Sequence, residues 1–336
     1  MMQSDKKILI TVKATTVLAF IVVVLGAYVR LSDAGLGCPD WPGCYGKMIV
    51  PFEVSHVQDI YPERPLEHGK AWKEMFHRYA AGILGLLVLM LAVFSWQQRK
   101  QPGQPLAVPS LLVLLLIFQA LLGMWTVTLL LKPVIVMGHL VGGMTILSLL
   151  LWMTLELGKE PQKVDLNNGR LYPWAITGLI VMIIQISLGG WTSANYAALV
   201  CPDFPKCQGV WWPVMDFKEG FVFWRGLGID YEGGILHGNA RTAIHMAHRI
   251  GAAFTVLIVS IVAIRAISDS NKRTAGLGTV ILLVLITQVG LGIANVLMRL
   301  PLPLAVAHNG VAALLLLSLV ALLHQSVIPV IKRRMY

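Results

Sequence analysis

The stretch EMFHRYAAG at 74–82 returns in altered form as HMAHRIGAA at 245–253, 171 positions later. Both copies place a His-Arg pair directly before a run of small and apolar residues. Their first ionisable residue differs, because Glu74 in the first copy is His245 in the second. The same helical pattern, apolar with charged side chains at matched positions, thus occurs twice in the chain. This repetition indicates a duplicated helical unit.

The composition around these stretches is that of an integral membrane protein. The chain has 336 residues, of which 56% are hydrophobic and 13% charged, and its mean hydropathy is +0.71. A helix needs about 20 apolar residues to cross roughly 30 Å of hydrocarbon. We therefore expect an all-α membrane protein with eight transmembrane helices, at roughly 10–29, 75–96, 108–130, 134–155, 172–194, 242–266, 276–298 and 304–328.

An even number of spans places both termini on one side of the membrane. Short segments on that side are rich in Lys and Arg, as at Arg99 and Lys100, Arg265, Lys272 and Arg273. Basic short loops face the cytoplasm, so we expect a multi-pass protein of the cell (inner) membrane with both termini cytoplasmic. The formal charge of +10 is then a signal of topology, and it does not indicate nucleic-acid binding.

Further landmarks recur at matched spacing. CPDWPGC at 38–44 and CPDFPKC at 201–207 are identical at five of seven positions, and QALLG at 119–123 resembles QVGLG at 288–292. Each of these glutamines lies twenty residues before a histidine, and a Leu-Gly pair precedes each cysteine segment. We expect two tandem four-helix bundles, 1–157 and 170–336, related by a pseudo-twofold axis along the membrane normal.

All four cysteines fall in the two long loops on the side opposite the termini. This compartment is oxidising, so the sequence predicts one disulfide per loop, Cys38 with Cys44 and Cys201 with Cys207. Five residues separate the two cysteines of each pair, which does not fit the C-x-x-C spacing of redox or zinc sites. A catalytic disulfide remains an alternative.

Four histidines occupy matched positions in the two units: His77, His139, His248 and His308. Each lies within about the first two turns of an even-numbered span, in the outer half of the membrane. A histidine there is costly and normally faces the interior of a bundle with a partner. The simplest alternative is four separate interhelical hydrogen bonds.

Small residues surround these histidines, as at Gly82, Gly142, Gly143, Gly251 and Gly310. A helix face without side chains opens a slot for a flat macrocycle, whose iron two axial imidazoles would hold from both sides. A zinc site normally gathers three or four ligands, whereas this repeat separates the histidines into two pairs. The pattern favours haem over zinc or copper, although small residues also serve plain helix packing.

Three charged residues accompany the histidines. Arg78 and Arg249 directly follow His77 and His248, where each could pair with a haem propionate or simply extend to the membrane interface. Glu74 lies one helical turn outward of His77 and could accept a proton or stabilise charge on the ring; a plain helix N-terminal acid is the alternative. The second unit lacks this acid, which favours one reactive and one supporting site.

These residues together resemble the haem A synthase family of membrane enzymes. The resemblance rests on LGAYVRLSDAGLGCPDWPGC at 25–44, the ExxHR pattern at 74–78, GHLVGG at 138–143, HMAHRIGA at 245–252 and AHNGVAALL at 307–315. It covers nearly the whole chain. It implies a haem-dependent oxidoreductase that converts the ring methyl of haem O to the formyl group of haem A for terminal oxidases.

The resemblance also implies a division of labour. The first bundle would bind substrate haem at His77 and His139, with Glu74 as the catalytic carboxylate. The second bundle would hold a haem B cofactor at His248 and His308. Expected partners are haem O, membrane lipid, an electron donor and a haem O synthase.

Two other functions fit parts of the pattern. A bis-histidine electron carrier of the membrane cytochrome type would explain the four histidines, but it has no need of an acid in one unit only. A disulfide-exchange enzyme would use the cysteines, but their spacing and the histidines count against it. The aromatic-rich long loops are expected to contact the membrane interface or to cover the haem sites.

Overall fold

The computed structural model describes residues 3–53, 60–62, 64–100, 106–158 and 166–334. Most of these residues are helical, and eight helices are long and apolar enough to cross a membrane. They are α1 (Gln3–Leu31), α3 (His68–Gln97), α4 (Ala107–Thr128), α5 (Pro133–Leu157), α6 (Tyr172–Ala194), α8 (Gly238–Ile267), α9 (Lys272–Leu297) and α10 (Leu302–Arg334). Two short helices, η1 (Leu166–Leu171) and α7 (Phe217–Gly220), lie in the connections. The predicted fold class is confirmed.

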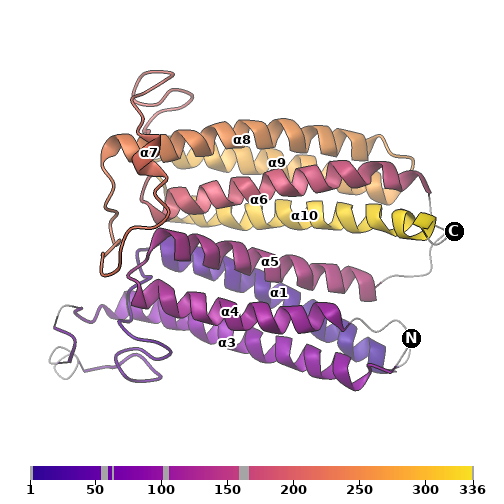
Figure 1. Cartoon of the computed structure of the whole chain (residues 1–336), viewed down its shortest axis with the longest axis horizontal. Coiled ribbons are helices and arrows are strands. Elements are labelled where there is room, and N and C mark those ends of the chain that lie inside the picture. The colour runs from indigo at the N-terminus through magenta and orange to yellow at the C-terminus, as the bar shows by residue number, and fades with distance from the viewer. Residues whose placement is uncertain (1–2, 54–59, 63, 101–105, 159–165, 335–336) are drawn as a thin grey trace.

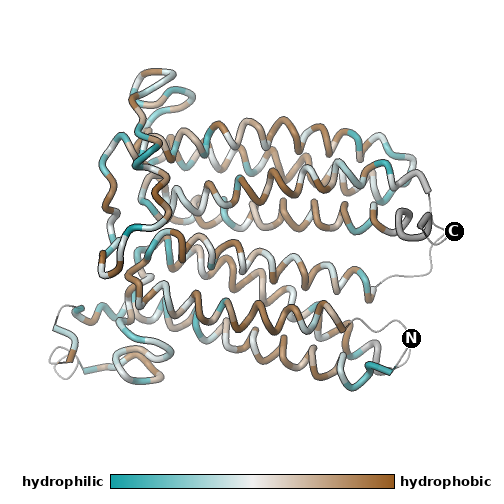
Figure 2. Tube along the Cα trace, viewed as in Figure 1, coloured by the Kyte–Doolittle hydropathy of each residue, from teal (hydrophilic) through white to brown (hydrophobic). Residues whose placement is uncertain are grey.

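The outer surface of these helices is apolar. Large hydrophobic side chains are exposed along their middles, among them Leu86, Leu114, Phe254 and Leu283. Figure 2 shows hydrophobic residues along the helices and most of the hydrophilic ones in the loops and at the helix ends. A surface of this kind is stable against hydrocarbon, because each helix satisfies its own backbone hydrogen bonds. The protein is therefore a multi-pass membrane protein.

The long helices pack as two groups, visible as the lower and upper halves of Figure 1. In the first bundle α1 and α4 each contact α3 and α5. In the second bundle α6 and α9 each contact α8 and α10. The two bundles meet through α1 with α10, α5 with α6 and α5 with α10. Exchanging the matched helices of the two bundles leaves this contact list unchanged, as two copies facing each other across an axis require.

The beginning of α1 and the end of α10 lie at one end of the bundles, and the two long outer loops lie at the other (Figure 1). These are the first outer loop, residues 32–67, and the second outer loop, residues 195–237. Two of the histidine helices start earlier than expected, so that His77 lies nine residues after His68 and His248 ten residues after Gly238. The apolar run marks only the hydrocarbon-crossing part of a helix, and these helices continue outward through polar residues.

Each outer loop contains a disulfide hairpin, and both predicted disulfides are present. Hairpin 1 (residues 38–52) joins Cys38 to Cys44, and hairpin 2 (residues 201–215) joins Cys201 to Cys207. Each makes one isolated β-bridge, Cys44 with Lys47 and Cys207 with Val210. The two turn residues between these bridge partners have positive φ, which explains a glycine at Gly46 (φ 74°) and at Gly209 (φ 80°).

Candidate functional site

Every one of the four histidines lies against a glycine of a neighbouring helix. A Cβ added to that glycine would lie 3.1–3.4 Å from Cε1 of the imidazole ring, so no larger residue fits without displacing the ring. The pairs are Gly26 of α1 with His77 of α3, Gly123 of α4 with His139 of α5, Gly189 of α6 with His248 of α8, and Gly292 of α9 with His308 of α10. The sequence therefore provides each histidine with a flat platform, in the same way four times.

The residue one turn before the platform glycine also faces the ring. The backbone carbonyls of Val22, Gln119 and Gln288 approach His77, His139 and His308. In the second bundle the Gln185 amide contacts Nδ1 of His248 at 3.0 Å, and the Gln288 amide contacts Nε2 of His308 at 3.2 Å. Gln185 and Gln288 thus each bond a histidine of a neighbouring helix, whereas Nε2 of Gln119 is buried without a hydrogen-bond partner among the described residues.

Three of the four rings keep an unsatisfied nitrogen. Nδ1 of His77, His139 and His308 is buried and has no full hydrogen bond within the described part of the chain. A buried polar atom normally has a partner, so such atoms in repeat-matched places mark a site completed by a ligand. A metal-ligating histidine commonly has a carbonyl or amide beside its ring, and the backbone carbonyls of Val22, Gln119 and Gln288 are close to three of these rings.

The histidines lie in two pairs. His77 and His139 are within electrostatic range of each other in the first bundle, and His248 and His308 are in the second. Among the described residues no three His, Cys, Asp or Glu side chains gather as a bare metal ion would require. Paired imidazoles against glycine platforms fit a haem group, whose iron His77 with His139 and His248 with His308 would hold. The residues present thus fit the predicted group.

Glu74 is buried in the first bundle, where it joins α3 to hairpin 1. One carboxylate oxygen accepts the backbone N–H of Cys38 at 2.9 Å, and the other accepts from the guanidinium of Arg78 at 2.5 Å. Only 5% of Glu74 is exposed, so the acid is held away from bulk water. A carboxylate fixed by two donors has one defined position, one turn outward of His77.

His245 occupies the corresponding position in the second bundle with different chemistry. It is also buried, and its Nδ1 lies 2.9 Å from the carbonyl oxygen of Ala197 in the second outer loop. Both residues therefore tie their helix to the outer loop. Within the part of the chain that the structure describes, only the first bundle places an acid beside its histidine pair.

Arg78 and Arg249 hold the two disulfide hairpins. Arg78 donates to the carbonyls of Asp40 (2.9 Å), Pro42 (3.3 Å) and Gly43, and Arg249 donates to those of Cys201 (3.3 Å), Asp203 (2.8 Å) and Lys206 (2.8 Å). From the sequence, these arginines were expected either to pair with a haem propionate or to extend to the membrane interface, and nothing indicated this set of contacts with the hairpins. Nε of Arg249 is buried and has no hydrogen-bond partner among the described residues.

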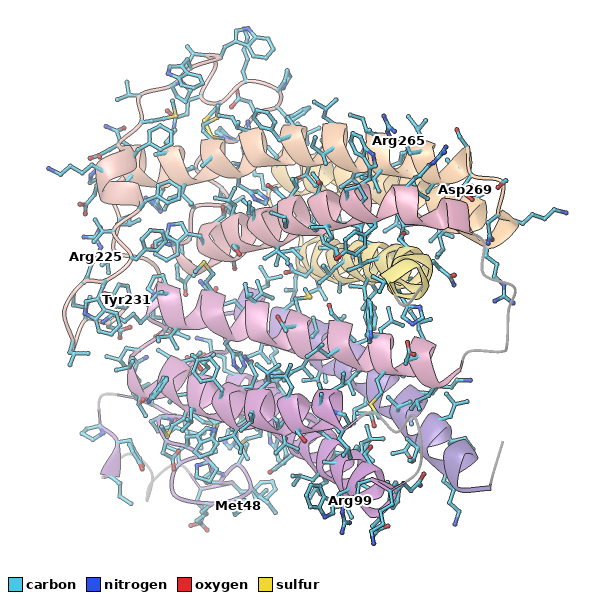
Figure 3. The ribbon with its side chains drawn as sticks, turned by 45° about the vertical axis from the view of Figure 1, so that its right-hand side comes forward. Met48, Arg99, Arg225, Tyr231, Arg265 and Asp269 are labelled. Carbon is cyan, nitrogen blue, oxygen red and sulfur yellow. A yellow bond between two sulfur atoms is a disulfide. The ribbon has the colours of Figure 1, made fainter. Side chains whose placement is uncertain are left out.

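A segment of the second outer loop, residues 224–232, crosses to the first bundle; we call it the cross-strap. Its Gly226 carbonyl accepts from Nζ of Lys132, which lies 3.5 Å from the centre of the Trp224 ring. Tyr231 donates its backbone N–H to the carbonyl of Leu130 at 3.1 Å. Figure 3 shows Arg225 and Tyr231 at the loop end of the molecule, between the two groups of helices.

The first outer loop also binds the cross-strap. Arg64 pairs with Asp230 at 2.5 Å and with Glu232 at 2.6 Å. A cavity of about 540 Å³ lies between the cross-strap and the first bundle, lined by Leu36, Pro39, Arg64, Val127, Leu130, Gly228 and Asp230. The second half of the chain thus covers the outer end of the bundle that contains Glu74.

In the sequence alone, the platform glycines are recognisable only as landmarks of the repeat. Gly26 and Gly189 each lie twelve residues before a cysteine, and Gly123 and Gly292 end the two glutamine motifs. Their constant spacing from the cysteine and histidine landmarks was the available signal, but it does not reveal that a histidine from another helix packs on each one. Lys132 and Arg64 gave no signal at all.

Known proteins of similar sequence identify the family to which this chain belongs. Residues 10–320 match the model of the COX15-CtaA family, described as cytochrome oxidase assembly proteins. The chain is 48% identical to the heme A synthase of Shewanella oneidensis over 316 residues, which cover 92% of this chain and 94% of that protein. It is 27% identical to the heme A synthase of Bacillus licheniformis over 303 residues, covering 88% and 87%. The chain therefore belongs to the COX15-CtaA family of cytochrome oxidase assembly proteins.

Proposed function

We propose that this protein is a haem A synthase, a membrane oxidoreductase that converts the ring methyl of haem O to the formyl group of haem A. The observation that carries the proposal is Glu74, the one buried acidic side chain among the described residues. Both bundles present a pair of histidines on glycine platforms, and Glu74 accompanies only the first pair. Heme A synthases are also the relatives that match nearly the full chain.

The two bundles divide the work in this proposal. The first, within residues 1–157, binds substrate haem O between His77 and His139. The second, within residues 170–336, holds a haem B cofactor between His248 and His308. The second bundle has His245 at the position where the first bundle has Glu74. This difference supports the division, because a site that only holds a cofactor needs no carboxylate. A histidine-bound haem supplies redox chemistry that amino-acid side chains lack.

The residues around the substrate site have distinct roles. Glu74 is the catalytic carboxylate, and the Cys38 N–H and Arg78 fix its position so that it accepts a proton or stabilises charge developing at the ring edge. Arg78 and Arg249 lie where a haem propionate would be bound, and Nε of Arg249 is a donor still available to one. Glycine platforms keep each imidazole in one orientation.

The location and partners follow from the same reasoning. The protein lies in the cell (inner) membrane with both termini in the cytoplasm, so the disulfide hairpins and both histidine pairs lie toward the outer face. That face is oxidising, which suits two disulfides. The reaction further requires an electron donor, and a haem O synthase would supply the substrate.

Identification of the bound haems tests this function. The purified protein is extracted and its haems are separated by chromatography. We expect haem B together with haem O, haem A or a hydroxylated intermediate from the wild type. Glu74→Ala should keep haem B and lose haem A and the intermediate. Glu67→Ala is the matched control, because Glu67 is exposed and forms a surface ion pair with Lys70 three residues away.

Two results would contradict the proposal. A protein that contains haem B alone, and whose haem content is the same with Glu74→Ala, would be a bis-histidine electron carrier. A preparation without iron would exclude both functions. Loss of haem from the first bundle and not the second on His139→Ala would, in turn, support the division of labour.

A further inference from the structure

Both disulfide hairpins expose apolar residues at the same register. In hairpin 1 Met48 is 66% exposed and Ile49 58%, and in hairpin 2 Trp211 is 66% exposed and Trp212 69%. The two pairs lie 163 residues apart, the same offset that relates Cys38 to Cys201. We call these four residues the hairpin tips. A repeated apolar pair that the protein itself does not cover indicates an external contact made twice.

The apolar tips belong to hairpins with a buried inner face. The cysteines of both hairpins are buried, as is Val50, which directly follows the tip of hairpin 1. The hairpins therefore have one face against the protein and one apolar face turned away from it. Exposed lysines, Lys47 and Lys206, lie on the same hairpins.

The length of the neighbouring helices sets the depth of the hairpins. α3 has 30 residues and is about 45 Å long, which exceeds the ~30 Å of a bilayer core. Its charged residues all lie at or before Arg78, and none occurs from Tyr79 to the end of the helix. α8 repeats the pattern, with no charged residue from Ile250 to Ile264. The outer boundary of the hydrocarbon is therefore near Arg78 and Arg249.

The hairpins are bonded to the helices at this boundary. The hydroxyl of Tyr79 donates to the carbonyl of Met48 at 2.5 Å, so the tip of hairpin 1 lies beside the first residue of the uncharged segment. Arg249, the residue before the uncharged segment of α8, donates to the carbonyls of Asp203 and Lys206 in hairpin 2. Both hairpins thus lie at the level where the membrane begins.

The figures place the hairpins beside the bundles. In Figure 1 the loop segments next to α3 and α8 project sideways from opposite flanks of the molecule, and Figure 3 shows Met48 at the margin on the side of the first bundle. The cross-strap, in contrast, lies beyond the helix ends (Figure 1). The apolar tips therefore continue the lipid-facing surface of α3 and α8.

We propose that the two hairpins are membrane-interface anchors and that the partner of their tips is the outer leaflet of the bilayer. Tryptophan, tyrosine and other apolar side chains are stable at the level of the lipid headgroups, and nearby lysines attract anionic headgroups. Each anchor is tied to its bundle, because Glu74 and Arg78 bind hairpin 1 and Arg249 binds hairpin 2. Lipid contact then holds the hairpin that positions Glu74. The proposal does not depend on the activity.

Nitroxide labels at single introduced cysteines test the proposal. The full chain is reconstituted in nanodiscs as Ile49→Cys, Trp212→Cys and, as the control, Leu227→Cys. Leu227 is equally apolar and is 71% exposed, but it lies on the cross-strap. Collision of each label with oxygen, which concentrates in the membrane, is compared with collision with a water-soluble nickel chelate.

We expect oxygen collision to dominate at positions 49 and 212 and nickel collision to dominate at 227. The logarithm of the ratio should therefore change sign between tip and control. Nickel collision dominating at the tips would overturn the proposal and would point to a water-soluble protein partner. Labels that neither reagent reaches would overturn it too, because they would show the tips buried against protein. Because the two tips are labelled in separate variants, the proposal can still be tested if one variant fails to fold.

Discussion

The smallest feature on which the site depends is the hydrogen atom that serves as the side chain of glycine. A methyl group at Gly26, Gly123, Gly189 or Gly292 would press on the adjacent imidazole, and the displacement would change the direction of its ring nitrogens. Protein interiors tolerate such added volume poorly, because neighbouring side chains are already close-packed. We therefore expect the four platforms to be as necessary for haem binding as the four histidines.

Helix α9 offers a matched pair of glycines for a test. Gly292 lies against His308, whereas nothing lies within 4 Å of a Cβ built at Gly290, two residues earlier. We expect Gly292→Val to lower the haem B bound per protein severalfold and Gly290→Val to leave it near the wild-type level. Visible absorbance per mole of purified protein measures the difference. Equal haem in both variants would show that the platform does not hold His308.

The exchange of Glu74 for His245 shows how one position can keep a structural task and change its chemistry. Glu74 accepts an N–H from Cys38, and the ring of His245 is bonded to the carbonyl of Ala197, so each side chain joins a helix to an outer loop. Only the carboxylate also pairs with an arginine. Glu74 is consequently both an anchor and the acid of the proposed reaction.

At the scale of the element, the disulfide hairpin is a small unit with its own hydrogen bonds. The carboxylate of Asp203 accepts the backbone N–H groups of Gln208 (2.6 Å) and Gly209 (2.9 Å), and Asp40 does the same for Tyr45 (2.6 Å) and Gly46 (2.7 Å). These bonds fix the turn with positive φ that follows each disulfide. An Asp at this position is thus part of the hairpin fold.

The charge of Asp203 makes hairpin 2 sensitive to acid. The N–H of Gly209, then that of Gln208, together with the positive charge of Arg249, hold the pKa of the Asp203 carboxyl below its ordinary value of 3.8. A depressed folded-state pKa gives stability that is complete above the ordinary value and is lost as pH falls through the lower folded value.

We therefore expect the Cys201–Cys207 disulfide to become easier to reduce as pH falls below 3.8. Reduction by a water-soluble phosphine, followed by thiol labelling and mass spectrometry, measures the rate. Asp203→Ala should be reduced faster than the wild type at neutral pH, and the two rates should converge in acid. A constant ratio of the rates across pH would contradict the assigned role of the carboxylate.

At the scale of the whole molecule, the halves of the chain are not independent. Besides the helix contacts between bundles, the cross-strap binds residues of the first half through Lys132 and Arg64. Lys132 is fully buried, with its ammonium group against a carbonyl oxygen and the face of Trp224. A buried cation with both contacts stabilises the attachment of the cross-strap to the first bundle, whereas an exposed ion pair contributes little to stability. We call these contacts of Lys132 the joint.

Removing this joint should release the cross-strap. Lys132→Met keeps an unbranched side chain that is one atom shorter, and it removes the charge. We expect hydrogen–deuterium exchange of residues 222–236 to accelerate on the order of tenfold, since a desolvated cation–π contact and a charged hydrogen bond are each worth roughly 1–3 kcal/mol. Lys70→Met, at an exposed ion pair with Glu67, is the control and should leave exchange unchanged. Unchanged exchange in both variants would contradict the joint.

The sequence by itself determined the eight helices, the cysteine pairing and the positions of the histidines along the chain. Membrane-crossing length, loop chemistry and repeat spacing are local properties, so they can be read from residues close together in the sequence. The starts of α3 and α8 lie earlier than hydropathy predicts, because the polar first turns of these helices extend beyond the hydrocarbon.

Only the tertiary structure decided which glycine meets each histidine, where Arg78 and Arg249 donate, and that the cross-strap covers the opposite bundle. These contacts join residues that lie far apart in the sequence, such as Arg64 with Asp230 and Gly26 with His77. They depend on how helices pack and loops fold back across them, and neither hydropathy nor spacing encodes that geometry.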